Sequence, residues 1–252
     1  MSVIECRRCV PKLSDVCCLV LSRLIPCVES LDGIPEHLGR RIFAELAPSF
    51  QCCRLQPKEK TAFVLFDRSY GTAFINSFCL SPAWNNTNLW LDLICLSQNV
   101  RYLYLDNCHL GTKHSGIFSH LGQLRQLMKL SLRQNHLSDD QIRSFTASGR
   151  FSAQSFLHCL DVSGNGYLSE RCVKLITGLK RLVEFHCGDT GIAISRTIII
   201  PNGWCAIPEQ TCFIRDEAPI GWFSDYVPTE SATSKPITME FEDPLSFYVK
   251  ST

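Results

Sequence analysis

Apolar and polar residues alternate over short stretches in the middle of the chain. In VRYLYLDNCHL, residues 100–110, apolar side chains stand at the first, fourth, sixth and eleventh positions. The central pair, Leu103 and Leu105, alternates with Tyr102 and Tyr104. In a β-strand, successive side chains point to opposite faces, so a pattern that repeats every two residues is typical of a strand. The stretch therefore predicts a short strand whose leucines face a core.

The same spacing returns three times further along the chain. The later copies are LMKLSLRQNHL from Leu127, LHCLDVSGNGYL from Leu157 and LVEFHCGDTGI from Leu182, and we expect a degenerate copy near residue 75. The spacing resembles the leucine-rich repeat, L-x-x-L-x-L-x-x-N/C-x-L. An amide or thiol at the Asn/Cys position can bond to backbone groups in the turn after the strand.

The copies begin at residues 100, 127, 157 and 182, which leaves room for a helix between consecutive strands. Helix starts are indicated by a capping box from Ser138 to Gln141 and by Ser169 before Glu170. The resemblance implies an α/β fold, a short solenoid with parallel strands on its inner, concave face and helices outside. Such an array needs caps at both ends to cover its core.

The pattern changes before the repeats. Residues 13–46 predict two helices, separated near Pro26 and by a turn that ends at Pro35. We expect a loop over 51–60 and a strand-rich stretch over 62–80.

These expectations divide the chain into an N-terminal tail and helical cap (1–60), the repeats (61–195), and a C-terminal cap and flexible tail (196–252). Within the last part, Trp204 and Trp222 are expected to close the core of the last repeat.

Composition indicates a globular chain. It has 252 residues, 45% of them hydrophobic, and a formal net charge of +1 without a dense basic run, so neither nucleic-acid nor membrane binding is favoured. The apolar stretch 16–28 is too short to span a bilayer and contains Arg23. Since no signal peptide is evident at the first residues, we expect an intracellular protein, cytoplasmic or nuclear.

The fifteen cysteines are expected to be reduced thiols. Several fall on positions that the repeats assign to core or turn, where cysteine acts as a small apolar residue. Cys6 and Cys9 form a C-x-x-C pair, but no second pair follows at the spacing of a zinc site. We therefore expect no metal ion and no cofactor.

The run from Leu13 to Ile194 resembles the leucine-rich repeat-containing protein 42 family. The likeness rests on the leader SLDGIPEHLGRRIF (Ser30–Phe43) and on LYLDNCHLG, LSLRQNHLSDDQIR and LDVSGNGYLSE in the repeats. The leader is the more specific part, because many unrelated proteins share the repeat consensus. The resemblance implies a non-enzymatic repeat protein.

The leader also resembles the elongin-binding box of cullin-RING substrate receptors, L-x-x-x-C-x-x-x-[AILV]. This resemblance implies that Leu13, Cys17 and Leu21 contact elongin C and that Pro35 lies near a cullin. Lys12 departs from the small or polar residue usual before the box. Two other interpretations stay open: the helices only cap the solenoid, or Ile34-Pro35 with Leu38 begins an F-box.

Strand alternation predicts which side chains line the concave face. They include Tyr102, Tyr104, Asp106, Lys129, Ser131, Arg133, Cys159, Asp161, Ser163, Glu184 and His186. Ser131, Asp161 and His186 resemble a hydrolase triad. A triad needs the histidine between serine and acid, however, and here the aspartate lies between them. We therefore expect no catalytic residues and no enzymatic activity.

The expected function is protein–protein interaction through this concave face, with a partner that the sequence does not identify. Aromatic and arginine side chains are enriched at binding hot spots. The candidate binding residues are Tyr102, Tyr104, Lys129, Arg133, Asp161 and His186. The alternative is a substrate receptor of an elongin-containing cullin-RING ubiquitin ligase, with elongin C and a cullin as partners.

Overall fold

A computed structural model of the chain describes residues 12–50, 56–80, 87–114, 116–151, 156–192, 204–207, 221–226 and 247–250. The cysteine pair Cys6 and Cys9 lies outside these residues, as does most of the expected C-terminal tail.

The centre of the molecule is a parallel sheet whose strands follow one another in sequence order. These strands are β1 (Ser77–Cys79), β2 (Tyr102–Tyr104), β3 (Lys129–Ser131), β4 (Cys159–Asp161) and β5 (Glu184–His186). At the far edge, β7 (Phe247–Lys250) pairs antiparallel with β5, and β6 (Trp204–Ile207) pairs with β7. The prediction of an α/β fold with parallel strands is confirmed.

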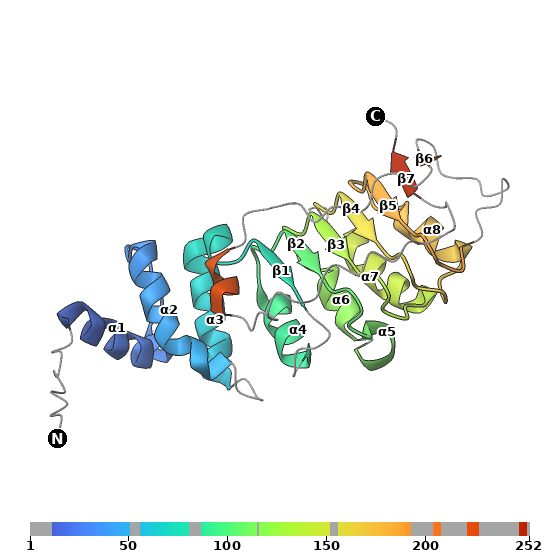
Figure 1. Cartoon of the computed structure of the whole chain (residues 1–252). Helices are drawn as coiled ribbons and strands as arrows, with labels where there is room; N and C mark the ends of the chain where they lie inside the picture. Colours follow the sequence, from blue (N-terminus) through green and yellow to red (C-terminus); the bar gives the residue numbers. More distant parts are fainter. Residues whose placement is uncertain are drawn as a thin grey trace, which may run out of the picture.

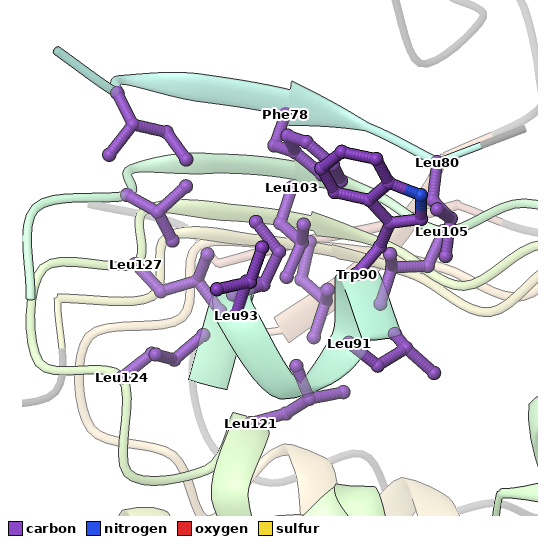
Figure 2. Packing of buried hydrophobic residues seen from close by; sticks show 14 of the residues in the cluster. Phe78, Leu80, Trp90, Leu91, Leu93, Leu103, Leu105, Leu121, Leu124 and Leu127 are labelled. Carbon is purple, nitrogen blue, oxygen red and sulfur yellow. The ribbon is translucent and has the colours of Figure 1, made fainter. Parts of the chain in front are cut away.

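Helices cover one face of this sheet, as Figure 1 shows. They are α4 (Thr87–Leu96), α5 (Leu110–Lys113), α6 (Ile117–Leu121), α7 (Asp139–Phe151) and α8 (Glu170–Ile176). The central residue of each strand points toward them, and Leu103, Leu130 and Leu160 are fully buried. Figure 2 shows Leu103 and Leu105 packed among apolar side chains of α4. The leucine spacing therefore builds one continuous core.

Asparagine side chains join two of the repeats to the repeat before them. Asn135 Oδ1 accepts hydrogen bonds from the backbone N–H groups of Cys108 (2.9 Å) and Leu110 (3.2 Å). Its Nδ2 donates to the carbonyl of Leu105 at 2.7 Å. Asn165 repeats this arrangement one repeat later, on the backbone that includes Asn135 N (2.9 Å). These bonds satisfy turn groups that burial would otherwise leave unpaired.

The N-terminal part is helical over a longer range than the sequence predicts. The two expected helices are present, α1 (Leu13–Leu24), followed by the 3₁₀ helix η1 (Ile25–Cys27), and α2 (Glu36–Phe50). The expected loop over 51–60 is wrong from Pro57 onward, and residues 51–55 lie outside the described part of the chain. The expected strand-rich stretch over 62–80 is wrong except at Ser77–Cys79, which forms β1. Residues 57–70 form α3 (Pro57–Tyr70), and the 3₁₀ helix η2 (Gly71–Ala73) follows.

The aromatic residues of this segment led to the wrong prediction, because aromatic residues favour strands. Within α3, Ala62, Phe63 and Phe66 are buried with the three-to-four-residue spacing of a helix face. Pro57 occupies the first turn, where its missing N–H costs nothing. Tertiary packing on this face outweighs the strand preference.

A cluster of aromatic rings holds the N-terminal helices to the sheet. Phe43 of α2 lies 5.0 Å from Phe66 of α3 and 5.3 Å from Phe74, between ring centroids. Trp222 and Phe223 enter this cluster from η3 (Trp222–Tyr226), 5.6 and 5.7 Å from Phe43. Edge-to-face rings at these distances stabilise a core beyond simple area burial.

The position of η3 corrects the expected role of Trp222. This residue packs at the N-terminal end of the sheet, not on the last repeat, and Phe223 N donates to Phe74 O at 2.8 Å. Gly221 is required beside it, because a Cβ there would lie 2.3 Å from the Phe74 carbonyl oxygen. The side chain of Trp204 lies outside the described part of the chain. Periodicity within a segment carries no signal for such a distant contact.

A buried carboxylate connects α3 to the first well-formed repeat. Asp67 accepts hydrogen bonds from the Ser97 hydroxyl (3.0 Å) and the Gln98 N–H (2.8 Å), in the turn before β2. Asn99 Nδ2 donates to the Asp67 carbonyl at 2.9 Å. Burial raises the pKa of Asp67, while these hydrogen bonds oppose the rise. The helical cap therefore contacts the repeats through polar hydrogen bonds as well as through aromatic packing.

Candidate protein-binding surfaces

The face of the sheet that points away from the helices is the first candidate surface, and we call it the helix-free face. In-register pairing aligns Tyr102, Lys129, Cys159 and Glu184 in one row. A second row holds Tyr104, Ser131, Asp161 and His186. The structure thus brings the strand residues of the predicted binding set onto one face, and Arg133 lies beside them.

The members of this set differ in how far solvent reaches them. Tyr102 and Lys129 are half-buried, and the Arg133 side chain keeps 42% of its surface exposed. Tyr104, Asp161 and His186 are buried. A partner approaching the helix-free face can reach the first three side chains, while the other three are not accessible to it.

The charged groups on this face bond mainly to one another. Asp106 accepts hydrogen bonds from the Ser131 hydroxyl and from Arg133 N. Arg133 Nε lies 3.8 Å from Asp161 Oδ2, and Ser163 N donates to Asp161 Oδ1 at 2.8 Å. Because Ser131 donates to an aspartate and not to a histidine, these residues lack the hydrogen-bonded relay of a hydrolase.

Burial shifts the acid–base properties of this network. It raises the pKa of Asp161 to about 6, against the opposing effects of Ser163 and Arg133. It lowers the pKa of His186 to about 4, and Arg133 and Lys129 add to this shift. At neutral pH the aspartate is therefore largely ionised and the imidazole is neutral.

Among the described residues, one group has the donor types and the proximity to hold a metal ion. Cys159, Glu184 and His186 each offer one ligand atom, and all three atoms lie within 4.8 Å of one another. Sequence reasoning missed this group because its members lie in different repeats. Only the parallel register of β4 and β5 brings Cys159 opposite Glu184.

The second candidate surface lies on α1. Five apolar residues of this helix are exposed, Leu13, Val16, Leu19, Val20 and Leu24. Leu13 has 78% of its surface exposed, and Cys17, one turn away, is exposed too. The opposite side of α1 packs inward through Cys18, Ser22 and the partly buried Leu21. Leu13 and Cys17 are therefore accessible, while Leu21 helps to hold α1 against the cap.

A groove of about 430 Å³ runs between α1, α2 and α3. Leu19 and Ile25 contribute apolar wall, and Phe50 of α2 lines it as well. Glu59 also lines the groove and is only 4% exposed, with Oε1 3.6 Å from Lys58 Nζ. Its Oε2 accepts no hydrogen bond from the described residues. This arrangement favours a hydrogen-bond donor or a cation within the groove.

A larger cavity of about 530 Å³ lies on the helical side, between α4 and the region of α5 and α6. Lys60 and Asp92 line it and pair at 3.2 Å. Burial raises the pKa of the Cys95 thiol there to about 12, and Asp92 contributes. Since the thiolate is the nucleophilic form, Cys95 is not activated for chemistry.

Comparison with known proteins supports the repeat interpretation. Residues 99–121, which contain β2 and the two short helices that follow it, match the model of the Leucine Rich Repeat family. No curated protein matches the chain significantly. The match, together with the parallel sheet, supports a leucine-rich repeat protein of the kind that commonly mediates protein interaction. None of the described helices is long and apolar enough to cross a membrane.

Thiol labelling tests the exposure of α1 directly, because Cys17 and Cys18 are neighbours with opposite burial. In the folded, reduced chain we expect iodoacetamide to modify Cys17 quickly and Cys18 slowly, since the buried thiol must wait for local opening. Fragment-ion mass spectrometry of the peptide assigns the label to either residue. Equal rates at both positions would show that α1 does not pack as described.

Proposed function

We propose that this chain is a non-enzymatic leucine-rich repeat solenoid that binds a protein partner through its helix-free face. The observation that carries the proposal is the register of β2 to β5, which sets polar, charged and aromatic side chains in rows on the helix-free face. The match of residues 99–121 to the Leucine Rich Repeat family supports it.

Three accessible side chains of this face have the properties of binding residues. Tyr102 offers a large ring with a polar tip, while Lys129 and Arg133 supply positive charge. The contact of Arg133 with Asp161 and the bonds of Asp106 hold the charges in place before a partner arrives. Such preorganisation lowers the entropic cost of binding. We therefore expect a partner with an acidic surface and an apolar contact point.

The test is a double variant, Tyr102→Ala with Lys129→Ala. Partners recovered with the intact chain by affinity enrichment are purified, and each dissociation constant is measured for both chains by biolayer interferometry. We expect affinity to fall at least about 30-fold, the scale of a hot-spot loss.

Tyr167→Ala is the matched control, because this tyrosine is 74% exposed in the turn after β4 and belongs to no strand. The control is expected to bind as the intact chain does. If the double variant binds as tightly as the control, the helix-free face is not the binding surface.

A second function is favoured by one observation, the exposure of Leu13 and Cys17. If both were buried in the cap, neither could enter a pocket of another protein without rearrangement. We propose that α1 recruits elongin C and that the chain then acts as a substrate receptor of a cullin-RING ligase. Pro35 is exposed at the start of α2, where a cullin contact is expected.

The recruiting role is tested with purified elongin B–elongin C complex and the variant Leu13→Ser with Cys17→Ser. We expect isothermal titration calorimetry to show binding to the intact chain and at least about 30-fold weaker binding to the variant, since both residues are central in this contact.

Val64→Ser provides the control, because Val64 is an exposed apolar residue on α3 and not on α1. It is expected to leave the affinity unchanged. If elongin does not bind the intact chain, the receptor function is wrong. Binding through the helix-free face then stands as the proposed function.

A further inference from the structure

The helix-free face holds three potential metal ligands side by side. Cys159 of β4 and Glu184 of β5 are directly opposite in the parallel register. His186 lies two residues beyond Glu184, so its side chain emerges on the same face. The strand backbone thus fixes the positions of all three without any loop.

The distances between the donor atoms are close to those that a zinc ion requires. Cys159 Sγ lies 3.2 Å from Glu184 Oε2, and Glu184 Oε2 lies 4.0 Å from His186 Nε2. Zinc bonds of about 2.0 Å to N or O and about 2.3 Å to S give tetrahedral ligand separations of about 3.3–3.6 Å. Small side-chain rotations therefore bring the atoms to a common centre.

We propose that Cys159, Glu184 and His186 form a zinc site on the helix-free face. A thiolate, a carboxylate and an imidazole are the three ligand types that zinc uses in proteins. Cys159 and His186 are buried and Glu184 is partly exposed, so the site opens toward solvent. Three protein ligands leave one coordination position for water or for a group from a partner.

Metal binding has to displace the proton of the Cys159 thiol, because a thiolate is the form that coordinates zinc. The Cys159 thiol donates its hydrogen to Glu184. When zinc binds, the Zn–S bond replaces the S–H bond and the proton leaves to solvent, so affinity is expected to rise with pH.

Two cations stand near the site and reduce its affinity. Lys129 is paired with Cys159 in the register, and Arg133 acts on His186. The positive charge of Arg133 is partly compensated by Asp161, whose Oδ2 lies 3.8 Å from Arg133 Nε. Removing Lys129 takes away one of these opposing charges, which favours the positive charge that a zinc ion brings to the site.

The proposal is tested with the full-length, reduced, metal-stripped chain, using Co²⁺ as a spectroscopic probe and Zn²⁺ in competition with it. We expect a sulfur-to-cobalt charge-transfer band and tetrahedral d–d bands that zinc abolishes. Cys159→Ala should lose the charge-transfer band. Glu184→Gln should weaken zinc binding at least about 10-fold, since even outer-shell changes cost that much. Lys129→Met should tighten it.

Cys172→Ala is the matched control for the other thiols of the chain, because Cys172 is equally buried but lies on α8. It is expected to keep the band. A thermal unfolding transition, measured before titration, shows that each variant is folded. Glu184→Gln changes the charge of a half-exposed side chain but keeps its shape. A band that is absent from the intact chain, or unchanged in Cys159→Ala, overturns the proposal. Neither result bears on partner binding.

Discussion

The hydrogen bonds that cross from one repeat to the next are the interaction on which this structure depends. Each parallel strand has three residues, too few to be stable alone, and the turn after each strand leaves buried backbone groups to satisfy. Asn135 and Asn165 supply those bonds to the preceding repeat. They hold the repeats of β2, β3 and β4 in register, and the register places side chains of the helix-free face in rows.

An array of this kind has exposed ends, and this chain covers both. At the N-terminal end, α2 and α3 pack on β1 through a cluster of aromatic rings that Trp222 and Phe223 complete. At the other end, β7 adds to β5 in antiparallel pairing. The segment η3 and the strand β7 are close in sequence but lie at opposite ends of the sheet, as Figure 1 shows. Segments from the C-terminal part of the chain therefore contribute to both ends of the sheet.

Most of the repeat region could be predicted from sequence, because leucine spacing reports local geometry. It identified the central core residues of β2 to β4 and the turn asparagines. It did not reveal that Asn107, Gln134 and Asp189 adopt left-handed backbone at one repeat position, where the third copy has Gly164. Aromatic composition misled at α3, since burial of one face outweighs residue preference. Trp222 and the Cys159–Glu184–His186 group depend on long-range contacts, which periodicity does not encode.

The claim that the asparagines hold the repeats in register is the most directly testable part of this account. Asn135→Ala leaves the Cys108 and Leu110 N–H groups and the Leu105 carbonyl without their partner, so we expect the free energy of unfolding to fall by about 3 kcal/mol. Urea denaturation measures it, with the exposed Gln126→Ala as control, expected within about 0.5 kcal/mol of the intact chain. Equal stability of the two variants would contradict the account.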